Sequence, residues 1–176
     1  TYTPLPTYTP LPTYTPQGGA TASPTSAPSP TSRVITPTVD PALPPDLGLL
    51  GLLNSARAGD ACTATLALEP RLHQAAQLHA EDLAKRGQVD HIGADGATYQ
   101  ERLDRAGYPY QRRGENIAAG YATVEEVFAA WMDEPPDGPH RANILNCAYR
   151  HAGVGLALRA DGYRYWVLDM AEPRAP

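Results

Sequence analysis

Two helical runs meet in the stretch WMDEPPDGPHRANIL, residues 131–145. The first run, 122–134, repeats apolar residues at three- and four-residue spacing, which predicts an amphipathic helix. Glu134 falls on the apolar face of that helix, three residues after Trp131, where a carboxylate costs free energy unless it is paired. Five turn-forming residues follow, and His140 opens the second run. The stretch therefore predicts that a turn brings Glu134 and His140 together as partners.

Three more helices are predicted from apolar spacing and end signals. Residues 46–59 form the first, with Asp46 as its cap and Gly59 at its end. Residues 69–87 form the second, and 97–108 form a shorter third. The second helix has a core stripe made of Leu72, Ala76, His79 and Leu83. On such a stripe we expect His79 to be a hydrogen-bonded core residue and not a ligand.

The C-terminal part alternates large and small residues. Residues 152–159 and 163–170 flank the turn ADG, which predicts a β-hairpin. Its small face would allow another element to approach closely, and consists of Gly153, Gly155 and Ala157.

A further short strand is predicted at 114–120, where Glu115 shares a face with Ile117. Helices followed by a few antiparallel strands indicate an α+β domain.

The N-terminal residues, 1–45, read as a linker, and 46–176 as the folded domain. The linker contains TYTPLP twice and is rich in Thr, Ser and Pro. It shows no hydrophobic period, so it cannot bury enough apolar area to offset its ordering entropy, and we expect disorder. A plain spacer and an O-glycosylated stalk both fit this composition.

Charge and hydropathy exclude several partners. The net charge is −5 and there is no run of Lys or Arg, which argues against nucleic acid and anionic membrane surfaces. The longest apolar stretch, 47–53, is too short to span a bilayer. The chain begins at Thr1, which we interpret as a processed or truncated form.

The chain contains two cysteines, Cys62 and Cys147, and neither belongs to a CxxC motif. In a cytosolic protein both would be small buried hydrophobic residues; in a secreted one they would pair. The stalk composition favours the outside of a cell, so we predict an extracellular or cell-surface protein with a Cys62–Cys147 disulfide.

Seven motifs in order carry a family resemblance: VDHIGADG, YQERLDRAGYPY, GENIAAGY, VFAAWMDE, GPHRANIL, AGVGLAL and YRYWVLDM. Together, over about residues 47–172, they resemble the CAP superfamily of cysteine-rich secretory, antigen 5 and pathogenesis-related proteins, also called SCP domains. The bacterial secreted branch is the most similar. The resemblance implies a three-layer α-β-α sandwich with a small antiparallel sheet and a surface cleft.

The resemblance also implies that the cleft holds two histidines and two acids, carried here by His91, Glu115, Glu134 and His140. The insert PPDGP between the last two departs from the family pattern. Histidine and carboxylate side chains are zinc-type ligands, so one divalent ion, zinc first, is one interpretation of the four residues. The other is a hydrogen-bonded network that satisfies partly buried polar groups.

Three functions remain open at this stage. The first is a binding module for a cell-envelope, glycan, lipid or protein ligand. The second is a metal-dependent hydrolase, with His140 or Glu115 as general base and a zinc-bound water as nucleophile. The third is an adhesion or display module with a vestigial cleft. We expect a monomer, and fold alone does not choose between these functions.

Overall fold

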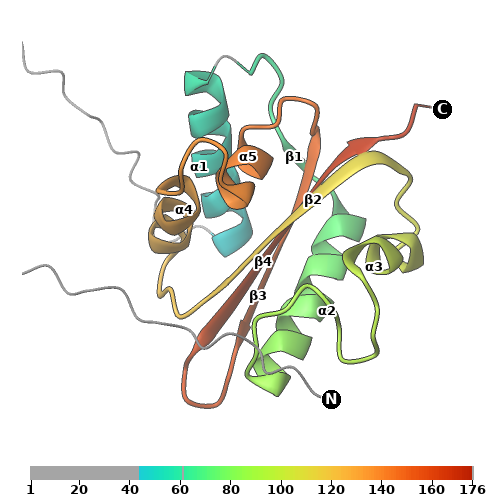
Figure 1. Cartoon of the computed structure of the whole chain (residues 1–176), viewed down its shortest axis with the longest axis vertical. Coiled ribbons are helices and arrows are strands. Elements are labelled where there is room, and N and C mark those ends of the chain that lie inside the picture. Colours follow the sequence, from blue (N-terminus) through green and yellow to red (C-terminus); the bar gives the residue numbers. More distant parts are fainter. Residues whose placement is uncertain (1–43, 61, 176) are drawn as a thin grey trace, which may run out of the picture. The chain divides into compact units, whose positions relative to one another are not determined.

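The structure is a computed structural model that describes residues 44–60 and 62–175. The predicted linker, 1–45, lies outside the described residues except for Pro44 and Pro45. The folded part is an α+β domain in which helices cover both faces of one sheet (Figure 1). The predicted fold class is therefore confirmed.

The sheet has four strands in the order β1-β3-β4-β2. The three long strands pair antiparallel, as predicted, and β2 lies at the edge. The two-residue strand β1 pairs parallel with β3, so the sheet is mixed and not purely antiparallel. The strands span Ala67–Leu68 (β1), Tyr110–Ala119 (β2), His151–Leu158 (β3) and Arg164–Pro173 (β4).

The helices divide between the two faces of the sheet (Figure 1). One face is covered by α1, Pro45–Gly59, together with α4, Val124–Met132, and α5, Pro139–Ile144. The other face is covered by α2, Pro70–Arg86, and α3, Tyr99–Arg105. These layers are the predicted three-layer sandwich.

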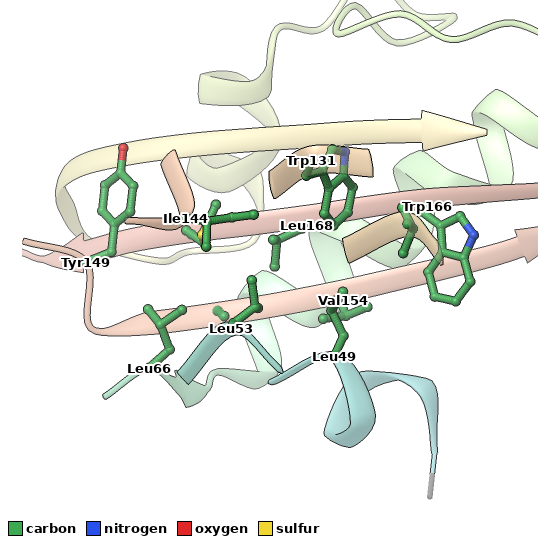
Figure 2. Packing of buried hydrophobic residues seen from close by; sticks show 12 residues of the cluster. Leu49, Leu53, Leu66, Trp131, Ile144, Tyr149, Val154, Trp166 and Leu168 are labelled. Carbon is green, nitrogen blue, oxygen red and sulfur yellow. The ribbon is translucent and has the colours of Figure 1, made fainter. Parts of the chain in front are cut away.

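The main core lies between the sheet and the α1, α4 and α5 layer (Figure 2). Leu49 and Leu53 of α1 meet Trp131 of α4 over the strands. Trp166 and Leu168 of β4 lie on the same face because side chains alternate along a strand. The side of α1 that carries Leu49 and Leu53 is therefore the side that packs on the sheet.

The small face of the hairpin does allow a close approach. A Cβ atom at Gly153 would overlap the backbone of Leu72, and one at Gly155 would overlap the backbone of Ala76. The α2 backbone thus lies directly on β3, which holds the start of the following loop close to the sheet.

Several predicted ends were wrong. The first helix begins at Pro45, so Asp46 lies in its first turn and is not its cap. The third helix is shorter than predicted, because Thr98 and Glu101 form a capping box that sets its start. The fourth helix ends at Met132, ahead of the two prolines 135 and 136, which places Glu134 in the turn after the helix.

The predicted disulfide is present, with the Cα atoms of Cys62 and Cys147 5.3 Å apart. Beside it, the buried guanidinium of Arg57 donates hydrogen bonds to the carbonyls of Ile144 and Tyr149 at 3.0 and 2.9 Å. Backbone oxygens thus satisfy both terminal nitrogens of the buried guanidinium. The disulfide and this arginine together fix the connection between α5 and β3.

Candidate functional site

The first His–Glu pair joins a loop to the edge strand. Glu115 of β2 is 7% exposed and lies on the α2 face with Ile117, as the alternation predicted. His91, in the loop after α2, is bound through Nδ1 to Glu115 Oε1 at 2.7 Å. Its side chain is 55% exposed, so the ring is anchored at one edge and open at the other.

Arg102 of α3 completes this pair, and no pattern in the sequence indicated it. Its Nη2 donates to Glu115 Oε2 at 2.5 Å. Its Nη1 donates to the carbonyls of His91 and Ala97 at 2.9 and 3.1 Å. One guanidinium therefore holds the strand carboxylate and the loop that carries His91.

A second acid, Asp169, lies opposite Glu115 in the β2–β4 register and is fully buried. Neither of its carboxyl oxygens accepts a hydrogen bond from the described residues. Burial, and then the negative charge of Glu115, raise the pKa of Asp169 well above its usual range. The raised pKa favours the protonated form of Asp169, whose proton can be donated to Glu115 in a hydrogen bond.

The pKa shifts of the first pair have opposite signs. Burial acts to raise the pKa of Glu115, but the hydrogen bond from His91 and the charge of Arg102 outweigh it, so the net shift is downward. The hydrogen bond to Glu115 raises the pKa of His91, against the effect of its partial burial. The pair thus favours an ionised carboxylate and a protonated imidazole.

The second His–Glu pair closes the turn between α4 and α5. Glu134 Oε1 binds His140 Nδ1 at 2.5 Å. Glu134 Oε2 accepts the backbone N–H groups of His140 and Arg141 at 2.9 and 3.4 Å. Because Gly138 at the start of α5 has no capping side chain, Glu134 satisfies these N–H groups in its place. These bonds outweigh the effect of burial and lower the pKa of Glu134.

Two asparagines connect the second pair to the edge strand. Asn116 of β2 donates to the carbonyl of His140 at 3.0 Å, and Asn143 of α5 donates to Asn116 Oδ1 at 2.9 Å. Since side chains alternate along a strand, Glu115 and Asn116 point to opposite faces of β2. The two His–Glu pairs therefore flank the same edge strand, one on each side.

The four predicted ligands are grouped as two pairs. In the part of the chain that the structure describes, no three His, Cys, Asp or Glu side chains are grouped so that they could hold a metal ion. Both oxygens of Glu115 are already bound, one by His91 and one by Arg102. The arrangement shown does not fit a four-ligand ion without rearrangement, and zinc binding stays a prediction.

His79 is a core residue, as predicted. It is 1% exposed, and its Nε2 lies 2.9 Å from the carbonyl of Asp90. Burial lowers the pKa of His79, so the ring is neutral, and Nε2 carries the proton because a carbonyl can only accept.

A family model described as CAP, the cysteine-rich secretory protein family, matches residues 50–170. The YkwD protein of Bacillus subtilis (strain 168), which is described as uncharacterized, is 36% identical over 90 residues. That match covers 51% of this chain and 34% of YkwD. The chain thus spans about a third of the length of this curated relative, and 22% of a second one, the YlbC membrane protein of the same organism.

Two solved structures show the same fold. An extracellular protein containing an SCP domain, from Bacillus anthracis str. Ames, is 24% identical with a TM-score of 0.63, over 72% of this chain and 40% of that one. An outer surface protein of Borrelia burgdorferi is 18% identical with a TM-score of 0.64, over 72% of this chain and 90% of that one. Within the described residues, no helix combines the length and the apolarity that a membrane crossing requires.

Proposed function

This chain belongs to the cysteine-rich secretory protein (CAP) family, and we propose that it is a binding module that acts outside the cytoplasm and holds a component of the cell envelope. The proposed binding surface, called the His–Glu face below, is formed by His91, Glu115, Glu134 and His140. The fold alone does not fix a function, so the proposal rests on the chemistry of these side chains.

One observation carries the proposal: both imidazoles are fastened through Nδ1 to a carboxylate. The side chains of His91 and His140 remain 55% and 27% exposed. Fastening one nitrogen orients the ring and leaves Nε2 as the atom that can meet a ligand. His91, whose pair favours the protonated imidazole, then presents an Nε2–H donor that suits the acceptor oxygens of a glycan, phosphate or carboxylate group.

The same hydrogen bonds make the acids poor catalysts. A general base works best when its pKa lies near the working pH, but the pKa values of Glu115 and Glu134 are both lowered. Glu115 is also occupied by Arg102. These facts argue against Glu115 as the general base of the hydrolase alternative and leave His140 as its candidate.

A location outside the cytoplasm is supported by two points. The Cys62–Cys147 disulfide is of a kind that persists in oxidising compartments. Two proteins of the same fold are described as extracellular and as an outer surface protein.

Co-sedimentation tests the proposal, with insoluble bacterial peptidoglycan and bacterial membrane vesicles as two separate probes. We expect the wild type to sediment with one of them and the double variant His91→Ala/His140→Ala to stay largely soluble. His73→Ala, an exposed histidine of α2, is the matched control and should behave as wild type. Absence of wild-type binding to both probes, or unchanged binding of the double variant, would contradict the proposal. Release of soluble peptidoglycan fragments would favour the hydrolase.

A further inference from the structure

A cavity of about 330 Å³ lies between α2, α3 and the loop 93–95. This cavity, called the α2–α3 pocket below, is separate from the second His–Glu pair and adjoins the first. Arg102 belongs to both, because it lines the pocket and also binds Glu115. The volume is at the small end of the range for ligand pockets, so it suits a single small group.

The charges in the wall of the α2–α3 pocket cancel one another. Asp82 is paired with Arg86 at 2.8 Å, and Asp95 is paired with Arg105. Arg102 is neutralised by the carboxylate of the edge strand. A charged ligand would find no unpaired countercharge there, and removing an unpaired charge from water costs much free energy. The pocket therefore favours an uncharged ligand.

Part of the wall is apolar and made of small side chains. Ala75 of α2 and Ala106 after α3 line the pocket together with Leu78, which is 58% exposed. The alanine methyl groups leave space for a ligand methyl group, and Leu78 offers it an apolar surface. An uncharged ligand with a methyl group matches this part of the wall.

The wall also has hydrogen-bonding capacity. Gln74, exposed on α2, contributes a side-chain amide. This amide donates through its nitrogen and accepts through its oxygen. The exposed side chains of Asp95 and Arg105 add carboxylate acceptors and guanidinium donors to the same wall. Groups of both kinds favour a ligand that donates and accepts hydrogen bonds.

We infer that the α2–α3 pocket binds the acetamido group and ring hydroxyls of an N-acetylated amino sugar. Such a sugar is uncharged, carries one methyl group beside an amide, and both donates and accepts hydrogen bonds. The inference deepens the proposed function and rests on it for the biological source of the sugar. It adds a sugar-binding pocket beside the His–Glu face.

The test is an NMR titration of the ¹⁵N-labelled chain with methyl N-acetylglucosaminide. We expect saturable shifts at the amides of Ala75, Ala94 and Ala106. Methyl glucoside lacks the acetamido group, glucosamine carries a charge, and octanoate has a chain without hydroxyls, so all three should bind about tenfold more weakly or worse. Equal binding of any of them would overturn the assignment of the sugar class.

Two variants place the binding in the pocket. Ala106→Phe fills the cavity and should weaken binding about tenfold or more, whereas Ala129→Phe makes the same change on the exposed side of α4 and should not. Gln74→Ala, at an exposed position, should weaken binding without disturbing the core. Unchanged affinity in both Ala106→Phe and Gln74→Ala would overturn the inference, as would no binding to the wild type.

The outcomes of this test and of the co-sedimentation are distinguishable. Envelope binding that Ala106→Phe leaves intact, with no sugar titration, would contradict the pocket and leave the His–Glu face supported. Sugar binding in the pocket without envelope binding would support the pocket and contradict the function proposed for the His–Glu face.

Discussion

The two His–Glu pairs use the same residue types for different tasks. Glu115 and His91 are 24 residues apart, and their carboxylate is buried in the sheet with Arg102 beside it. Glu134 and His140 are six residues apart, and one oxygen of their carboxylate binds the N-terminal amides of α5. The first pair holds α3 and a loop against the strand, whereas the second caps a short helix. The residue types of a pair alone therefore do not indicate how much the pair contributes to stability.

The largest change in the free energy of unfolding is expected for Glu115→Ala. This change leaves Arg102 largely buried without its carboxylate, and breaking a buried ion pair from one side costs about 3–5 kcal/mol. Urea denaturation with the disulfide intact measures the loss. The matched control is Glu172→Ala on β4, whose partner Arg112 is 57% exposed, where we expect less than about 1 kcal/mol. Equal losses in the two variants would show that the first pair is no more than a surface contact.

A smaller change in stability is expected for Asp169→Asn, and it should be a gain and not a loss. The folded-state pKa of Asp169 is raised above its ordinary value of 3.8. The unfolded chain therefore loses this proton at lower pH than the folded chain, and the wild type loses stability as pH rises above about 4. Asparagine keeps a donor for Glu115 without this penalty. At pH 7 the variant should therefore be more stable than the wild type, by a difference that grows as pH rises above about 4.

Melting curves of wild type and Asp169→Asn from pH 3 to 8 check this sign. The two should converge at the acid end and separate as pH rises. Parallel curves over the whole range would mean that Asp169 does not hold a proton in the folded state.

The second pair should contribute less than the first. Glu134→Gln weakens the bonds to the α5 amides, so we expect a loss of about 0.5–2 kcal/mol at pH 7, as for other helix caps. The folded-state pKa of Glu134 is lowered from 4.5, so its contribution is present above about pH 4.5 and disappears as pH falls through the folded value. His140→Ala keeps the backbone amide and should cost less stability than Glu134→Gln. A larger loss in His140→Ala would show that the ring contact, and not the cap, holds the turn.

The difference between the pairs also explains what could be predicted from the sequence. Glu134 and His140 are close in the chain, and the turn residues between them, together with the family resemblance, predicted their contact, although Glu134 lies in the turn and not on the helix. Arg102 and Asp169 were missed because their contacts with Glu115 depend on how α3 docks and on the β2–β4 register. The acid within the apolar run YRYWVLDM was a usable signal for Asp169.

For the fold, apolar spacing predicted four helices and the hairpin, the stretch 131–145 predicted a fifth helical run beginning at His140, and the resemblance supplied the layers. The strand Ala67–Leu68 was missed because two residues carry no period, and their pairing is set by β3. Helix ends were wrong where a cap or a proline pair, and not the apolar face, sets the boundary.

The smallest change in stability is expected from the binding of a zinc ion, which would join the two pairs. An ion held by all four side chains must displace Arg102 from Glu115 and separate each carboxylate from its histidine, so we predict weak binding. At a zinc concentration equal to Kd, the gain in stability is only about 0.4 kcal/mol. Affinity should fall as pH drops through about 6, and the raised pKa of His91 starts this loss at higher pH than for a free histidine.

In calorimetric zinc titrations, Glu134→Gln and His140→Ala should each weaken binding, and the double variant should lose little more, because one site cannot be broken twice. Additive losses, or wild-type affinity in either single variant, would show that Glu134 and His140 do not form a shared metal site.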